Sequence, residues 1–370
     1  MMNATRDAAG RIPREPTRHE AQWREVVESG ELHRRHEALR ARQSLPLNDK
    51  IALSLERIRE WSEAFDGAVS VSFSGGKDSA VLLWLARQVD PTIPAVFCNT
   101  GLEYPEIVAL VKRTRNSVVL RPKKPFHHII KDHGWPVVSK KVARGISILK
   151  NPTGVNQNIW RLYDRGVNRF GHPVNGFRIP NRWRFLVDAP FPISDKCCQI
   201  MKKDPMLRYG RETGRVPMVG TMAGDSKARE KVYLATGCNA FDAKHPRSMP
   251  MGFWRERDVL EAIRRFGIEV PSVYGDIEDG PDGPRFTGVH STGCLFCMFG
   301  LHMEGTPNRF QRLRESHPHL LRFCLDRLGM GNVLDFIRSR CPDRSVRGAF
   351  TAAPYHAPPE QRGLFRSIDE

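Results

Sequence analysis

The clearest pattern in the chain is a short apolar run, a glycine-containing turn and a second apolar run. Residues 68–73 (AVSVSF) have the composition of a buried β-strand, and residues 80–86 (AVLLWLA) that of a helix buried on more than one face. Between them lies the sequence SGGKDS, residues 74–79. We therefore predict a strand, a tight turn and a helix in this order.

The alternation of strand and helix continues beyond this first unit. Short apolar runs predict further strands at 94–98, 118–120 and 216–221, and a helix is predicted at 104–115. Strands that alternate with helices are typical of a parallel sheet covered by helices on both faces. We expect an α/β fold with a doubly wound, mostly parallel sheet, whose ligands lie beyond the carboxyl ends of the strands.

Outside this region the pattern predicts helices near both ends of the chain. Charged amphipathic periodicity is found before the first strand and again after residue 300, whereas the two extremes are polar and lack periodicity. The expected parts are a disordered arm (1–18), N-terminal helices (19–65), the α/β domain (66–300), a C-terminal helical segment (301–343) and a flexible tail (344–370).

Basic residues are concentrated in one insertion of the α/β domain, residues 139–186. It contains ten Lys or Arg residues and one acid, Asp164, and so carries +9 of the +17 formal charge of the 370-residue chain. Six aromatic residues lie between the basic ones, which suits contacts to phosphates and stacking on bases. A solvated basic surface whose aromatic rings pack inward has the same composition. We expect a loop-rich segment and favour a nucleic-acid partner for it.

The apolar runs are too short for a membrane protein. None approaches the roughly 20 residues that a spanning helix needs, and the arginine-bearing N-terminus lacks the apolar stretch of a signal peptide. The expected location is therefore the cytoplasm, with no membrane partner. Eight cysteines in that compartment are better explained as ligands, nucleophiles or buried thiols than as disulfides.

The SGGKDS turn has the features of a phosphate-binding loop. Glycines allow close approach of the backbone to an anion, and the N-terminus of the following helix supplies free amides and the positive end of its dipole. Lys77 adds a full charge, and Ser79 is suited to cap the helix. The spacing differs from a Walker loop, which needs GxxxxGK followed by Ser or Thr. A turn that only joins strand to helix is the alternative.

Cysteines form a second group of candidate residues. Cys197 and Cys198 are adjacent, and Cys294 and Cys297 form a C-x-x-C turn about a hundred residues later. If the fold brings both pairs together, four thiolates suit an iron–sulfur cluster or zinc. Adjacent cysteines are an unusual zinc spacing, so we favour a 4Fe-4S cluster. Unliganded or redox-pairing thiols are the third possibility, and Cys238 is a possible replacement ligand.

Several motifs together resemble one family. They are SGGKDS at 74–79, NTGLEYPE at 99–106, DKCC at 195–198 and GTMAGDS at 220–226, the last followed by Arg229. From about residue 68 to about residue 300 the chain resembles the phosphoadenosine phosphosulfate reductase family of the adenine-nucleotide alpha-hydrolase (PP-loop) superfamily. The cysteine pattern is similar to the cluster-binding pattern of adenylyl-sulfate reductases.

The resemblance implies roles for individual residues. ATP or a related adenine nucleotide would be held by Ser74, Gly75, Gly76, Lys77, Asp78, Ser79 and Arg229, and the cluster by Cys197, Cys198, Cys294 and Cys297. Thr100 and Gly101 follow the strand at 94–98 and are further candidates for nucleotide binding. Lys77, Asp78 and Arg229 are the catalytic candidates, acting with Mg²⁺ on the phosphates.

Two departures from the family shape the functional hypothesis. The reductases carry a nucleophilic cysteine in a C-terminal ECGLH-like motif, which this sequence lacks, and Met222 stands where they tend to have arginine. We therefore expect a PP-loop enzyme that cleaves ATP to pyrophosphate and inserts sulfur into nucleic acid, using a sulfur donor protein. The alternatives are a sulfonucleotide reductase, which is an oxidoreductase and not a transferase, and a non-catalytic regulator that binds nucleotide and DNA.

Overall fold

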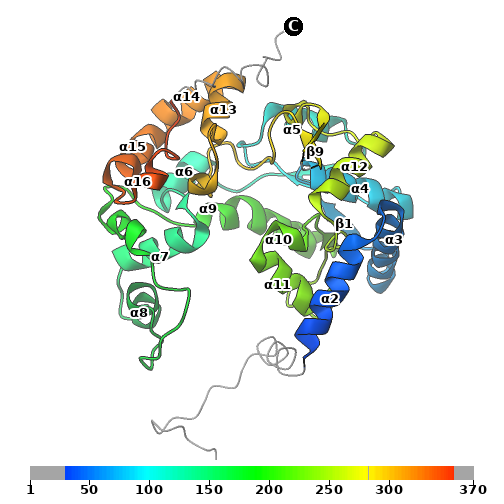
Figure 1. Cartoon of the computed structure of the whole chain (residues 1–370), viewed down its shortest axis with the longest axis horizontal. Helices are drawn as coiled ribbons and strands as arrows, with labels where there is room; N and C mark the ends of the chain where they lie inside the picture. The colour runs from blue at the N-terminus through cyan, green and yellow to red at the C-terminus, as the bar shows by residue number, and fades with distance from the viewer. Residues whose placement is uncertain (1–29, 282, 354–370) are drawn as a thin grey trace, which may run out of the picture. The chain divides into compact units, whose positions relative to one another are not determined.

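The computed structural model describes residues 30–281 and 283–353, so the expected arm (1–18) and the end of the expected tail (354–370) lie outside the described residues. The chain forms two compact units (Figure 1). The first unit comprises residues 30–95, Arg215–Val270 and Ile277–Arg285, and the second comprises Val96–Gly214, Pro271–Asp276 and 286–353. None of the described helices is long and apolar enough to cross a membrane.

Six short strands form the main sheet, in the order β3-β2-β1-β5-β7-β6. Their bounds are β1 (Val69–Ser72), β2 (Ala95–Cys98), β3 (Ser117–Leu120), β5 (Val216–Met218), β6 (Asn239–Ala240) and β7 (Arg247–Ser248). β1 pairs in parallel with β5 and β5 with β7, whereas β6 is antiparallel to β7. The sheet is therefore mixed and mostly parallel, and the prediction of an α/β fold with such a sheet is confirmed.

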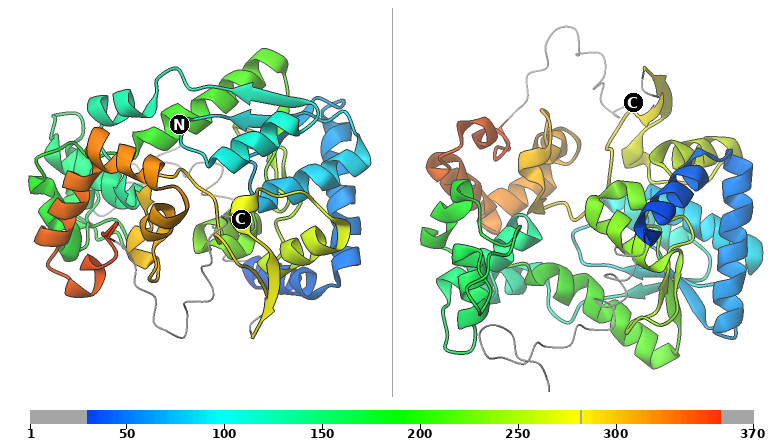
Figure 2. Two further views of the ribbon diagram at one scale, coloured as in Figure 1. Left: turned by 90° about the horizontal axis from the view of Figure 1, so that it is seen from above. Right: turned by 60° about the horizontal axis from the view of Figure 1, so that its bottom comes forward.

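The first unit is built around β1 and the helix that follows it. Its other elements are α2 (Glu31–Ser44), α3 (Leu47–Ala64), α4 (Lys77–Val89), the 3-10 helix η3 (Ala223–Asp225), α11 (Lys227–Thr236), α12 (Glu256–Phe266), and the hairpin strands β8 (Ile277–Gly280) and β9 (Gly283–Phe286). Apolar residues of β1 and α4 are fully buried, and α3 and α12 both pack against α4. Figure 2 shows α2 and α3, in blue, from two further directions.

Helix α3 buries polar residues together with apolar ones. Lys50 Nζ lies 2.6 Å from Asp258 Oδ2, and both side chains are buried. The Ser54 hydroxyl accepts from Trp254 Nε1 at 2.9 Å and donates to the carbonyl of Pro250 at 3.0 Å. The Lys50–Asp258 ion pair therefore joins α3 to α12, and the hydrogen bonds of Ser54 join α3 to the segment that precedes α12.

The second unit is mostly helical. Its elements besides β2 and β3 are α5 (Pro105–Arg113), α6 (Phe126–Asp132), β4 (Val137–Val138), α7 (Lys140–Lys150), α8 (Gln157–Arg165), η1 (Asn181–Asp188), α9 (Lys196–Cys198), the π-helix η2 (Gln199–Lys203), α10 (Asp204–Thr213), η4 (Ser272–Tyr274), β10 (Met298–Phe299), η5 (Leu301–Met303), α13 (Arg309–Ser316), α14 (Pro318–Arg322), the π-helix η6 (Phe323–Arg327), α15 (Met330–Arg340) and α16 (Arg344–Arg347). β4 and β10 form a separate two-stranded parallel sheet.

The C-terminal segment is ordered beyond residue 343. Asn308 caps α13 by accepting from two backbone amides, and its side-chain amide donates to the carbonyls of Ala349 and Thr351. Phe350 is 1% exposed. Residues 344–353, which the sequence places in the tail, therefore include α16 (Arg344–Arg347), and the segment after α16 is hydrogen-bonded to the start of α13.

The basic insertion contains more helix than its composition suggests. α7, α8 and η1 account for much of it, and loops lie at 151–156 and 166–180. Tyr163 and Trp183 are buried, whereas Phe170 and Phe177 are 38% and 41% exposed. Two of these aromatic residues are thus buried and contribute to packing, whereas the other two are exposed to solvent.

Candidate functional site

The predicted phosphate loop connects β1 to α4 in the first unit. Gly75 has a φ of +73°, which a side chain would disfavour, and α4 begins directly after Gly76. The Ser79 hydroxyl accepts from Ser74 N at 3.2 Å and donates to Gly76 O at 2.9 Å. Ser79 therefore ties the loop together from inside the first turn. It is not the N-cap of α4, a position that Gly76 occupies without a side-chain cap.

Lys77 lies at the start of α4 among carboxylates. Its side chain is almost fully buried, and Nζ is 3.5 Å from Asp78 Oδ2 and 3.4 Å from Glu256 Oε1. Burial raises the pKa of Asp78, an effect that the charge of Lys77 opposes and that the charges of Asp225 and Glu256 reinforce. The loop therefore holds a preplaced cation whose present partners an anionic phosphate can replace.

Arg229 lies on α11 and is ion-paired with Asp225. The charge of Asp225 contributes to the raised pKa of Asp78, so this pair is within electrostatic range of the loop. The side chain of Arg229 remains half exposed. Of the nucleotide-binding candidates, the 74–79 loop and Arg229 thus belong to the same unit.

Gly220 allows the close packing that the loop requires. A β-carbon at this position would lie 2.9 Å from Asp78 O and 3.0 Å from Asp78 C, both backbone atoms. We expect Gly220→Ala to lower the free energy of unfolding by about 1–3 kcal/mol, the usual cost of overpacking, and to weaken nucleotide binding. Denaturant unfolding measures the first effect and calorimetry the second.

Gly224→Ala is the matched control for this prediction. Gly224 is exposed, belongs to the same unit, and has no atom within 4 Å of a β-carbon built on it. Equal stability of the two variants would contradict the steric role of Gly220.

Thr100 and Gly101 belong to the second unit, where they form a loop organised by Glu103. The Glu103 carboxylate accepts from Thr100 Oγ1 at 2.7 Å and from Thr100 N at 2.9 Å. Gly101 has a φ of +76°, and its amide donates to Asn99 Oδ1. The carboxylate therefore has a structural role in this loop, and a role of Thr100 and Gly101 in nucleotide binding stays a prediction.

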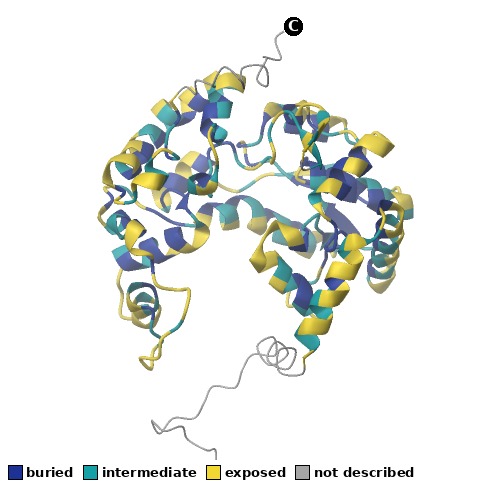
Figure 3. Cartoon of the chain, in the orientation of Figure 1, coloured by how far each residue is buried: buried dark blue, intermediate teal, exposed yellow. Residues whose placement is uncertain are grey.

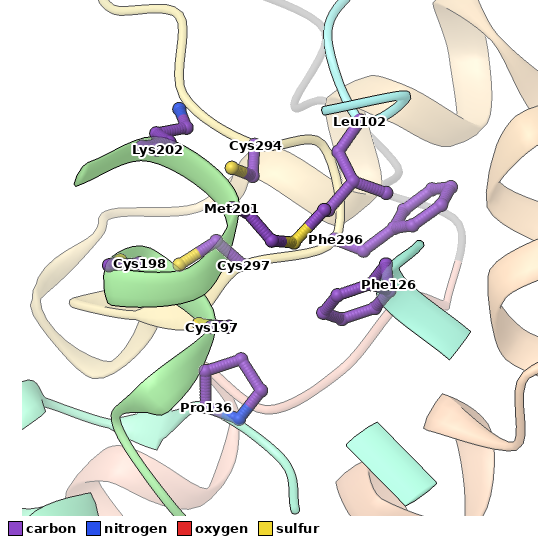
Figure 4. Close-up of a pocket in the computed structure, with 10 residues that line it drawn as sticks. All are labelled: Leu102, Phe126, Pro136, Cys197, Cys198, Met201, Lys202, Cys294, Phe296 and Cys297. Atoms are coloured by element: carbon purple, nitrogen blue, oxygen red, sulfur yellow. The ribbon is translucent and has the colours of Figure 1, made fainter. Parts of the chain in front are cut away.

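All four predicted cysteine ligands line one pocket of the second unit (Figure 4). Cys197 and Cys198 lie on α9, at the start of a helix that continues through the π-helix η2 into α10. Cys294 and Cys297 lie on the loop that leads into β10. The pocket is also lined by Leu102, Phe126, Pro136, Met201, Lys202 and Phe296. The fold thus brings the two cysteine pairs together, as the sequence predicts.

The segment 135–138 holds both cysteine pairs. Trp135 forms a parallel bridge with Ile193, just before the first pair. β4 pairs in parallel with β10, directly after Cys297. Arg309 also donates from Nη1 to the carbonyl of Cys297 at 3.0 Å. Both cysteine segments are therefore held by backbone pairing to the same four-residue segment, residues 135–138.

The four thiols differ in acidity. The hydrogen bond from Cys197 and the charges of nearby lysines together lower the pKa of Cys198 to about 6, whereas donation of this bond raises the pKa of Cys197. Burial raises the pKa of Cys294, and burial raises that of Cys297 to about 11. Binding of a metal at these thiols therefore has to displace protons from three of them.

The four thiols are suited by their chemistry to bind a metal ion or cluster, although in this structure they are not arranged around a metal position. Four thiols facing one pocket are the ligands of tetrahedral zinc and of iron–sulfur clusters. Within residues 30–281 and 283–353, however, no three or more His, Cys, Asp or Glu side chains are arranged to hold a metal ion. The pocket leaves about 20 Å³ free, room for roughly one water.

Comparison with known proteins identifies the region that contains the phosphate loop. Residues 68–138 match the model of the phosphoadenosine phosphosulfate reductase domain. These residues belong to the phosphoadenosine phosphosulfate reductase domain family. The resemblance inferred from the sequence motifs is thereby confirmed, and the name of the family refers to an adenine nucleotide. The specific reaction of this chain does not follow from the match.

Individual relatives are distant. The chain is 24% identical over 260 residues to the uncharacterized protein MJ0973 of Methanocaldococcus jannaschii, covering 70% of this chain and 47% of that protein. It is 24% identical over 228 residues to sulfate adenylyltransferase subunit 2 of Streptomyces lavendulae, covering 60% of each. The chain thus spans roughly half the length of these relatives.

The chain also aligns with a solved structure. The phosphoadenylyl-sulfate reductase from Candida auris, crystallised as a phosphate complex, aligns with a TM-score of 0.33 and 13% identity, over 62% of this chain and 91% of that chain.

Sequence reasoning missed several residues of these sites. Glu256 contacts Lys77 from α12, and no local motif connects the two positions. Gly220 belongs to the GTMAGDS motif, but the motif does not indicate that this glycine lies against the backbone of Asp78. Arg309, which anchors the C-x-x-C loop, follows Cys297 by twelve residues without a recognisable pattern. Such contacts arise from tertiary packing, which spacing along the chain does not encode.

Proposed function

We propose that this protein is an ATP-using enzyme of the PP-loop type that activates an oxygen atom of its substrate by adenylation. The observation that supports this most directly is the buried Lys77 at the head of α4, held between two carboxylates beside the glycine turn. An amine in this place suits the phosphate chain of a nucleotide, because the helix amides and dipole favour an anion at the same position.

The proposed reaction has two steps. The substrate oxygen attacks the α-phosphorus of ATP, the bond between this phosphorus and the bridging oxygen of the β-phosphate breaks, and Mg²⁺-bound pyrophosphate leaves. Hydrosulfide supplied by a donor protein then attacks the activated carbon, so that a C–S bond forms, the C–O bond to the adenylate breaks and AMP leaves. Lys77 and Arg229 stabilise the charge that develops on the α-phosphate and on pyrophosphate, and Asp78 is a candidate for contact with the Mg²⁺.

The four cysteines are proposed to hold an iron–sulfur cluster. Cys197, Cys198, Cys294 and Cys297 supply four thiolates from one pocket, with apolar side chains around them. Such a cluster supplies electron transfer or a relay for sulfur. Zinc is the alternative occupant, because the donor set suits both.

Nucleic acid is the proposed acceptor, supported by the charge of the 139–186 insertion. Reduction of a sulfonucleotide to sulfite is the second candidate reaction, favoured by the family match of residues 68–138. Against it stands the sequence, which lacks the cysteine motif that the reductases use to attack sulfur.

Two assays on anaerobically prepared protein separate these candidates. With ATP, Mg²⁺, RNA or DNA, and sulfide in place of the donor protein, we expect pyrophosphate and AMP in equal amounts. With a sulfated adenylate and reduced thioredoxin, we expect no sulfite. Release of sulfite would establish the reductase, and absence of both products despite ATP binding would support a non-catalytic regulator.

A further inference from the structure

The basic insertion carries a small, well-ordered hairpin at residues 166–174. Val174 N donates to Gly166 O at 2.7 Å, and Asn168 N donates to His172 O at 2.9 Å. At the tip, the Asn168 side-chain oxygen accepts from the amides of Phe170 and His172 at 2.9 and 3.1 Å. The tip therefore has one conformation, set by its own hydrogen bonds.

This ordered tip presents an aromatic ring and a cation to solvent. The guanidinium of Arg169 lies 4.5 Å from the centre of the Phe170 ring, and the His172 ring is T-shaped to the Phe170 ring, with 6.4 Å between the ring centres. Phe170 is 38% exposed although the hairpin is ordered. A phenylalanine ring that a hydrogen-bonded turn keeps exposed to solvent is typical of a binding surface.

A second exposed ring follows the hairpin. Phe177 is 41% exposed, and its ring packs against the edge of the buried Tyr163 at 6.2 Å. Ile179 N donates to Tyr163 O at 2.9 Å, which attaches this stretch to α8. Figure 3 shows in yellow that the loops next to α8 are exposed. The rings of Phe170 and Phe177 thus both reach solvent from the same 166–180 loop.

The charges of the insertion divide into paired and unpaired groups. Arg144, Arg182 and Arg184 form ion pairs with acids, and Lys150 donates to backbone carbonyls. Five exposed cations have no acidic partner among the residues that the structure describes: Lys140, Lys141, Arg161, Arg169 and Arg178. A polyanion can neutralise positive charges that have no acidic partner within the protein.

We propose that the 166–180 loop binds single-stranded nucleic acid. Phe170 and Phe177 stack on unpaired bases, and Arg169 and Arg178 of the same loop contact the phosphates. A single strand is favoured because a duplex keeps its base faces inside the helix. This inference rests on the proposed function, for which it names the surface that takes up the nucleic-acid acceptor.

Fluorescence anisotropy with a labelled oligothymidine of about 20 nucleotides, longer than a typical binding site, tests the inference on the full chain. We expect the logarithm of the association constant to fall with the logarithm of salt concentration with a slope of at least about −1.4, from about −0.7 for each of the two phosphate contacts of the loop. Arg169→Ala/Phe170→Ala should weaken binding by about tenfold or more and reduce the slope by about 0.7. Phe177→Ala should weaken binding by about fivefold or more without changing the slope.

The chain offers a matched control in a second Arg-Phe pair of the same unit. Arg322 is exposed and Phe323 is 50% exposed, and neither lies in the insertion. Arg322→Ala/Phe323→Ala should leave oligothymidine binding within twofold of the unsubstituted protein. An equal loss in both double variants would overturn the proposal, as would equal affinity for a duplex or for polyglutamate.

ATP binding is measured on the same samples. Normal ATP binding without any oligothymidine binding would refute the surface and leave the proposed nucleotide chemistry standing. Oligothymidine binding without ATP binding would refute the nucleotide chemistry and leave the surface standing.

Discussion

Lys77→Ala is expected to reduce pyrophosphate release by about 100-fold or more. Loss of one preorganised charge from a reacting centre commonly lowers turnover by about 10²–10³-fold. Lys77 is 5% exposed and lies within 3.5 Å of two carboxylates, so its amine is already held where a phosphate chain would replace them. A coupled pyrophosphate assay measures turnover, and calorimetry with ATP measures binding.

A second variant separates this effect from a loss of folding. Removal of the Lys77 charge leaves Asp78 and Glu256 close together without their cation, which destabilises the loop. Lys77→Ala/Glu256→Gln relieves that repulsion, and it should still fail to release pyrophosphate. Lys244→Ala, on an exposed loop of the same unit, should behave like the unsubstituted protein. A folded Lys77→Ala protein that binds and cleaves ATP normally would refute the assignment of the loop.

The phosphate loop could be predicted because its determinants are local. The apolar runs around SGGKDS correspond to β1 and α4, and the glycine that needs a positive φ is indeed Gly75. The exact cap of α4 was not predictable in the same way, because Ser79 satisfies its hydroxyl inside the loop. A residue type favoured at a cap does not reveal which of several nearby partners it will choose.

Polar burial was the least predictable part of the fold. Lysine is almost never fully buried, yet Lys50 of α3 is fully buried against Asp258, more than two hundred residues away. The cost of burying an amine is offset only by a partner that the helix's own sequence does not contain. The same reason explains why Glu256 was not associated with Lys77.

The cysteine site lies between these extremes. Four thiols of matching chemistry could be found by counting, and the structure does place them around one pocket. The spacing did not reveal the role of residues 135–138. This segment pairs with residues next to each cysteine pair and so brings the two pairs together. The candidate ligands could therefore be identified from the sequence, whereas the contacts that bring them together could be seen only in the tertiary structure.

Cys197→Ser and Cys294→Ser, each alone, are expected to remove most of the bound metal. One substitution in each pair tests whether both segments contribute to the same group, since a site that loses one of four thiolate ligands loses much of its affinity. We expect about four irons and matching acid-labile sulfide per chain in anaerobically prepared protein, and less than about a quarter of that in either variant. Iron, zinc and sulfide analysis with the visible absorption spectrum gives the readout.

Buried cysteines elsewhere in the chain are the controls. Cys324 packs against Met330 in the C-terminal helices, and Cys238 lies in the first unit beside Tyr233, with its Sγ 3.9 Å from the phenol oxygen. Cys324→Ala and Cys238→Ala should keep the full metal content, and the second also tests whether Cys238 replaces one of the four ligands. About one zinc without sulfide would assign the site to zinc. Protein that contains neither metal, with variants indistinguishable from it, would refute a metal role and leave four thiols whose proximity must serve redox chemistry or packing.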